Sequence, residues 1–186
     1  MTQRERASRV TRWTAPLLIA IAALVLALQG IGEPGVRELV RWTARASFLI
    51  FLVAFATPFF SSGSWLARNR HGILVTLAIS FGIHALAVGW LGIHTHGVNL
   101  IERSSAFDVV GGLGAYLFLF LMALRPNSRY VALGLYWLWV ALGSVYFLKA
   151  ISLPLVFGPP ALLLGLVMVL RVSATLGWAR REPERA

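Results

Sequence analysis

The chain has 186 residues, of which 58% are hydrophobic and 13% are charged, and its formal net charge is +10. A soluble domain carries roughly 25% charged and 45–50% apolar residues, so this chain has more apolar surface than one small core can bury. The composition excludes an ordinary soluble domain and indicates a protein that is solvated by lipid. The absence of cysteine excludes disulfides, thiolate metal sites and iron–sulfur clusters built from this chain.

Six apolar segments follow one another along the chain, and each has close to the roughly 20 residues that a transmembrane helix needs. Backbone polar groups in lipid must be satisfied within the segment, which favours helices, and the runs do not alternate in polarity as barrel strands would. We therefore predict an all-α fold, a single membrane domain over residues 1–186 built as a six-transmembrane-helix bundle. The expected spans are about 14–32, 44–61, 72–92, 107–124, 130–149 and 154–173.

Two of these segments allow a second interpretation. The first follows "RERASRVTRW" like a signal peptide, but its apolar stretch is too long and no convincing small-residue cleavage site follows, so we expect a retained span. The sixth contains Pro159 and Pro160, and its helix could begin at Pro159 rather than Pro154.

The distribution of basic residues predicts that both termini are cytoplasmic. With the N-terminus inside, only five of the 17 basic residues fall in outer loops: Arg37, Arg41, Arg45, Arg103 and Lys149. The positive-inside rule favours this orientation, and we expect a multi-pass protein of the bacterial inner membrane. The inner arginines are expected to meet anionic lipid headgroups, so we expect no nucleic-acid partner.

His84 is the residue that calls for a functional explanation, because it lies within the run "ILVTLAISFGIHALAVGWL". If this span begins near His71, His84 lies about 20 Å deeper at 1.5 Å per residue. An ionisable residue at that depth is a functional hypothesis by default. Neutral imidazole can ligate haem iron. The alternative is a hydrogen bond to a neighbouring helix, for example to Tyr136, Tyr146 or a serine.

The remaining polar residues point to less chemistry. Ser80 and His84 share one helix face, but no acid stands near to orient a catalytic pair. His71 follows two arginines and is more simply an interfacial residue. His94 and His96 form "HTH" in an outer loop, a weak metal signal without a third ligand nearby.

No Asp or Glu lies well inside a span, which argues against a proton pump or a coupled transporter. The longest stretch outside the spans is about 14 residues. Flavin or nucleotide chemistry would therefore need another protein.

Three stretches carry a family resemblance: "WLARNRHGILVTLAISFGIHALAV", "VVGGLGAYLFLFLMALRPN" and "LGLYWLWVALGSVYF". Over residues 40 to 150 the chain resembles the ferric-reductase-like transmembrane domain family, in which haem b sits between the third and fifth helices. The resemblance implies electron transfer through haem, held by a histidine from each of those helices. By this match His84 falls on the third-helix ligand, and His71 on an inner position that some members also use.

The chain departs from the family in the fifth helix. The positions where the family carries histidines are occupied by Val131 and Ser144, and the fifth span contains no histidine. Three outcomes stay open. Haem could be held by His84 alone or with Met122 or Tyr136, a second subunit could supply the missing ligand, or the haem has been lost.

We therefore expect a membrane haem b protein that moves electrons within or across the membrane, with His84 as axial ligand. It would be at most the electron-transfer component of an oxidoreductase, working with another redox or membrane subunit. The alternative is a haem-free structural or assembly subunit of a larger membrane complex. A small-molecule transporter is less favoured, because the spans contain neither buried charge nor a plainly broken helix.

Overall fold

The computed structural model describes residues 3–60, 63–95, 106–124 and 130–179 of the chain. Within these ranges every regular element is a helix. The long helices are α1 (Gln3–Gln29), α2 (Glu33–Ala56), α4 (Arg70–His94), α6 (Ala106–Leu124), α7 (Tyr130–Ser152) and α8 (Pro154–Ala179). Two short elements, η1 (Thr57–Phe59) and α3 (Trp65–Arg68), connect α2 to α4.

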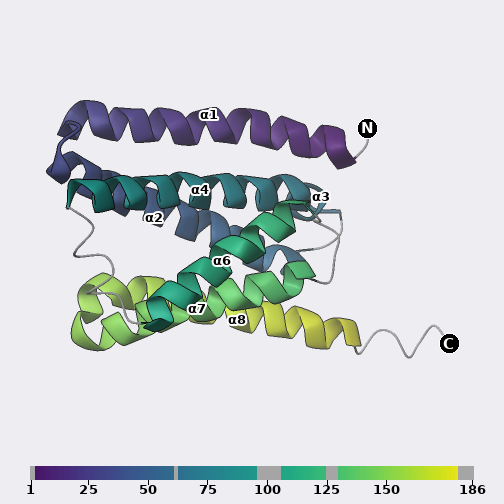
Figure 1. Cartoon of the computed structure of the whole chain (residues 1–186). Helices are drawn as coiled ribbons and strands as arrows, with labels where there is room; N and C mark the ends of the chain where they lie inside the picture. Colours follow the sequence, from purple (N-terminus) through teal and green to yellow (C-terminus); the bar gives the residue numbers. More distant parts are fainter. Residues whose placement is uncertain (1–2, 61–62, 96–105, 125–129, 180–186) are drawn as a thin grey trace.

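Five of the long helices form a closed ring. Neighbouring contacts run from α2 to α4, α4 to α6, α6 to α7, α7 to α8 and back from α8 to α2. The first helix, α1, lies outside this ring and packs on α4 and α2 (Figure 1). The start of α1 and the end of α8 lie at the same end of the bundle, which we call the N-end (Figure 1). The opposite end is called the far end.

The middle of the ring is filled by large apolar side chains. Phe51 and Phe55 of α2 are fully buried, together with Leu77 of α4, Leu135 of α7 and Leu164 of α8. Aromatic contacts extend this core, for example between Phe48 and Tyr146, whose ring centroids lie 4.8 Å apart. Side chains therefore hold the helices together across the centre of the ring.

Five helices among the described residues are long and apolar enough to cross a membrane: α1, α2, α4, α7 and α8. Apolar side chains also cover the outside of the bundle, where Leu155 is 93% and Ile151 is 81% exposed. Such a surface suits lipid rather than water. These findings support the prediction of a multi-pass, all-helical membrane protein. The side chains of 106–113 in α6 lie outside the description, so the sixth span stays a prediction.

The first two helices extend beyond the N-terminal limits of the predicted spans. Helix α1 begins at Gln3, whereas its span is predicted from about residue 14, and α2 begins at Glu33, whereas its span is predicted from about 44. The charged stretch that begins α2 is therefore helical and not a loop. Its charges are compatible with a helix because Glu33 pairs with Arg37 and Glu38 with Arg41, one turn further on.

The last helix begins at Pro154, so the alternative start at Pro159 was wrong. Only Leu153 separates α7 from α8. Pro154 stands at the first position of α8, where a missing backbone N–H removes no helical bond. Pro159 and Pro160 lie inside the helix. Membrane helices tolerate internal prolines because neighbouring groups satisfy the freed carbonyls.

Candidate functional site

A stripe of polar residues runs along one face of α4 through the apolar bundle. Thr76, Ser80 and His84 are spaced four residues apart and therefore lie above one another on the helix. Thr76 is 6% and Ser80 only 2% exposed, and His84 is half-buried. Polar groups at such positions need hydrogen-bond partners, because lipid and apolar side chains supply none.

Each residue of the stripe meets a hydroxyl group from another helix. We call these three pairs the polar ladder. The two oxygen atoms lie 2.9 Å apart in Thr14–Thr76 and 2.8 Å apart in Ser47–Ser80. In the third pair, Thr43 Oγ1 lies 3.0 Å from His84 Nδ1. The first pair joins α1 to α4 and the other two join α2 to α4. Hydrogen bonds of this kind hold helices together in membranes.

The contact with His84 is made by Nδ1 of the imidazole. Its partner, Thr43 Oγ1, also lies 2.8 Å from the carbonyl oxygen of Leu39 and 3.1 Å from that of Val40. Among the residues that the structure describes, Nδ1 makes the only side-chain hydrogen bond of the His84 ring. Nδ1 thus links His84 to α2, whereas Nε2 contacts no other described side chain through a hydrogen bond.

A small and mostly apolar hollow lies beside the ladder where α1, α2 and α4 meet. Thr43 and Ser80 contribute its polar lining. The remaining lining residues are Leu18, Ile21 and Ala22 of α1, Leu39, Trp42 and Ala46 of α2, and Ile83 of α4. Because α1 packs outside the ring, this hollow lies between the ring and its peripheral helix.

The structure separates His84 from the other histidines proposed for a site. His71 is the second residue of α4, thirteen residues before His84, which corresponds to about 20 Å along the helix. The two cannot ligate one iron. His94 is the last residue of α4 and its side chain lies outside the described part, as does His96 entirely. In the described ranges no three His, Asp or Glu residues gather as a metal site.

The two α7 positions where the family carries histidines, Val131 and Ser144, offer no nitrogen ligand. Val131 is fully buried in the core, and the Ser144 hydroxyl donates to the carbonyl of Ala141 in its own helix at 2.8 Å. Two alternatives named from the sequence lie at another depth. Met122 lies two residues, or about 3 Å, from the N-end of α6, and Tyr136 lies six residues, or about 9 Å, from the N-end of α7. His84 lies fourteen residues, or about 21 Å, from the same end of α4.

Arg171 is a feature that the sequence did not reveal as a buried charge. It is only 4% exposed, and its Nη1 donates to the carbonyl oxygen of Phe55 at 2.7 Å. Its guanidinium carbon lies 4.5 Å from the Phe55 ring centroid and 4.8 Å from that of Tyr136. In the described ranges no carboxylate pairs with it. The position near the end of the last span was the available signal, but it equally fits an arginine at the lipid headgroups.

Arg171 joins α8 to the end of α2. The C-terminal end of a helix carries partial negative charge on its last carbonyls, which favours a cation there. Pro58 cannot donate an N–H to the carbonyl of Ala54, and the Thr57 hydroxyl donates to it instead at 2.8 Å. Two carbonyl oxygens at the end of α2 thus accept hydrogen bonds from side chains, one from Thr57 and one from Arg171 of α8.

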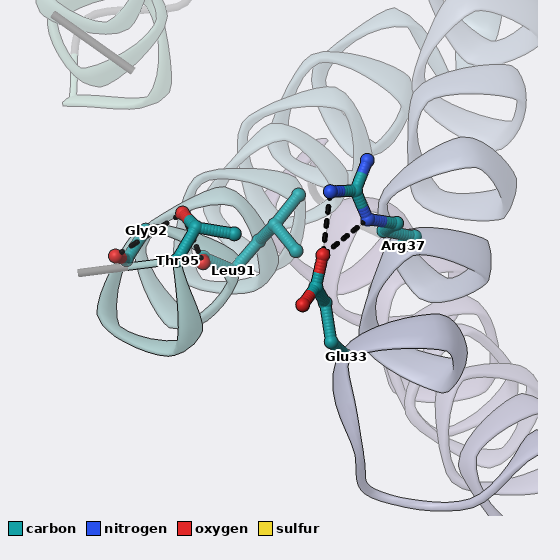
Figure 2. A network of polar contacts seen from close by, with 5 residues as sticks. All are labelled: Glu33, Arg37, Leu91, Gly92 and Thr95. Carbon is teal, nitrogen blue, oxygen red and sulfur yellow. Dashed lines mark hydrogen bonds and ion pairs between the residues drawn. The ribbon is translucent and has the colours of Figure 1, made fainter. Parts of the chain in front are cut away.

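Charged and hydroxyl groups lie at the far end of the bundle, where α2 begins and α4 ends. Nε of Arg37 lies 2.8 Å from a carboxylate oxygen of Glu33, and Figure 2 draws this pair together with the last turn of α4. There the Thr95 hydroxyl lies 3.0 Å from the carbonyl of Leu91. Both described acidic side chains, Glu33 and Glu38, lie in the first turns of α2 and pair with arginines. Neither forms part of the polar ladder.

No family model matches the chain, and neither a curated protein nor a solved structure matches it. The geometry around His84 and the family resemblance of the sequence are therefore the features that bear on function.

Proposed function

We propose that the chain is an integral membrane haem b protein that moves electrons within or across the bacterial inner membrane, with His84 as axial ligand. The observation that carries the proposal is the position of His84 inside α4, bonded through Nδ1 to Thr43 while Nε2 makes no side-chain hydrogen bond among the described residues. Histidines that ligate metals commonly donate their second ring N–H to a neighbouring group, and this contact has that form.

His84 is the residue of this chain that would hold a haem. A pair of histidines from α4 and α7 is not available, because Val131 cannot ligate iron and the Ser144 hydroxyl is bonded within its own helix. When bound, the haem supplies one-electron redox chemistry. The chain would contribute the ligand nitrogen of His84, the hydrogen bond to Thr43 that orients it, and a low-dielectric surrounding that excludes water. Either His84 would hold the haem alone, or another subunit would supply a second ligand.

The proposed orientation has six spans with both termini in the cytoplasm. It is supported by the placement of α1's start and α8's end at one end of the bundle (Figure 1) and by the arginines near that end. Arg68 and Arg70 lie there on the α3–α4 corner, whereas Arg37 and Lys149 lie toward the far end. The uneven distribution along the whole sequence favours a cytoplasmic N-end.

A second candidate function is a haem-free structural or assembly subunit of a membrane complex. The polar ladder favours it, because the contact of His84 with Thr43 joins α2 to α4 without any cofactor. In this function His84 would serve the same purpose as Ser80, which joins the same two helices.

The test is an optical spectrum of the detergent-purified protein, before and after reduction with dithionite, with haem supplied during expression. The unaltered protein is expected to show a Soret band that both His84→Ala and His84→Asn lose. Asparagine can still donate to Thr43 Oγ1 but cannot replace the imidazole as iron ligand.

His71→Ala is the matched control, because it alters a histidine on the same helix and is expected to keep the Soret band. Stoichiometric haem in His84→Ala would refute the assignment of His84. A normally folded protein without any Soret band would leave the structural function as the better account.

A further inference from the structure

The contact between Thr43 and His84 determines which imidazole nitrogen carries the proton. A threonine hydroxyl has one hydrogen to donate and lone pairs that accept. Thr43 Oγ1 lies 2.8 Å from the carbonyl oxygen of Leu39 and 3.1 Å from that of Val40, and a carbonyl can only accept. The hydroxyl hydrogen is therefore directed at its own helix. Oγ1 is left as the acceptor for His84 Nδ1 at 3.0 Å, and this arrangement favours a proton on Nδ1.

We propose that Thr43 is a positioning residue that holds His84 in the Nδ1–H tautomer and thereby presents the Nε2 lone pair as the ligating atom. In a neutral imidazole only one nitrogen is protonated, so a proton fixed on Nδ1 leaves Nε2 unprotonated. The part of this inference that concerns haem rests on the proposed function. The tautomer itself is a property of the chain without any cofactor.

The opposite tautomer is disfavoured on two counts. The Thr43 hydroxyl would have to turn away from both carbonyls and donate to Nδ1 instead. Nε2 would then carry a hydrogen for which no described side chain supplies an acceptor. A donor left unsatisfied in an apolar setting is unfavourable, whereas the Nδ1–H form satisfies every N–H of the ring.

Among the α2 residues of the polar ladder, Thr43 contacts the imidazole, whereas Ser47 contacts another hydroxyl. Ser47 bonds Ser80 at 2.8 Å, one turn away on the same two helices, and so contributes to helix packing without contacting an imidazole. Ser47→Ala therefore serves as a matched control for Thr43→Val. Each change removes one hydroxyl from α2, but only Thr43→Val removes the hydroxyl that contacts His84 Nδ1.

The experiment is nitrogen-15 NMR of histidine-labelled protein without haem in lipid nanodiscs, with the His84 signals identified by their loss in His84→Asn. In the unaltered protein Nδ1 is expected to give the protonated and Nε2 the unprotonated type of signal. Thr43→Ser and Ser47→Ala are expected to keep this pattern, whereas Thr43→Val shifts His84 toward Nε2–H. A protonated Nε2 in the unaltered protein, or an unchanged pattern in Thr43→Val, would overturn the inference.

A haem titration of the same proteins tests the consequence for ligation. Loss of a group that orients a metal ligand typically lowers affinity by about 10–100-fold, and we expect this for Thr43→Val but not for Thr43→Ser or Ser47→Ala. Equal affinity in all four proteins would refute the positioning role toward haem. If none of them binds haem, the proposed function fails, and the NMR result still decides whether Thr43 fixes the tautomer.

Discussion

Replacing Gly35 by alanine is expected to open the turn that sets α1 against α2. A Cβ atom on Gly35 would lie 1.8 Å from the carbonyl oxygen of Gly30, 2.8 Å from its carbonyl carbon and 2.9 Å from the oxygen of Gln29. All three are backbone atoms, so no side-chain rotation relieves the contact. The turn is itself defined, because Gly30 has a φ of 82° and its N–H donates to Leu26 at the end of α1.

The size of the effect follows from the overlap. Nonbonded carbon contacts are most favourable at about 3.5–4.0 Å, so the start of α2 and the end of α1 must separate by more than about 1 Å. Overpacking costs typically about 1–3 kcal/mol, and Gly35 lies at the upper end because the atoms it meets are backbone. A loss of about 3 kcal/mol lowers the melting temperature of a chain of this size by about 6–12 °C.

The measurement is thermal unfolding of the detergent-purified protein, followed by loss of helical circular dichroism. Gly82→Ala in α4 is the control, since nothing lies within 4 Å of the added Cβ, and its melting temperature is expected to stay unchanged or rise slightly. Gly30→Ala also meets no atom within 4 Å, but its positive φ costs about 1–2 kcal/mol. A melting temperature of Gly35→Ala equal to that of the unaltered protein would show that the turn is not packed as described.

Two further predictions concern polar contacts between helices. Arg171→Lys keeps the charge but loses the planar group that faces Phe55 and Tyr136 at 4.5 and 4.8 Å, so we expect about 1–2 kcal/mol lower stability in the same unfolding assay. An unchanged unfolding midpoint would contradict this. Ser47→Ala and Ser80→Ala, alone and combined, should show a coupling energy near 0.6 kcal/mol, the average for such bonds in a membrane protein. A coupling energy of zero would argue against the 2.8 Å contact.

The helices were predictable from the sequence, but two of their ends were not. Long apolar runs reveal spans because lipid requires helices of about 20 residues. Charged residues were taken to end a span at about residue 44, whereas α2 continues back to Glu33. A helix does not have to end where the hydrocarbon ends. The pairing of Glu33 with Arg37 and of Glu38 with Arg41 supports helical turns beyond it.

The candidate site was predictable on α4 but not across the helix interfaces. The spacing of Ser80 and His84 placed both on one face, and the structure adds Thr76 one turn earlier. A hydrogen bond from His84 to another helix was among the alternatives, but the tyrosines named for it were wrong. The partner is Thr43, 41 residues away, and spacing within one helix carries no information about which helices become neighbours.

The two candidate functions differ in what they require of residue 84. A purely structural ladder needs only groups that satisfy one another, and the Thr14–Thr76 and Ser47–Ser80 pairs show that hydroxyls suffice. A hydroxyl or amide at position 84 could also satisfy Thr43. Histidine adds a second ring nitrogen, Nε2, which makes no side-chain hydrogen bond among the described residues. The haem proposal requires this nitrogen as a ligand, whereas the structural ladder requires only the contact with Thr43. His84→Asn keeps a donor for Thr43 and therefore separates the two functions.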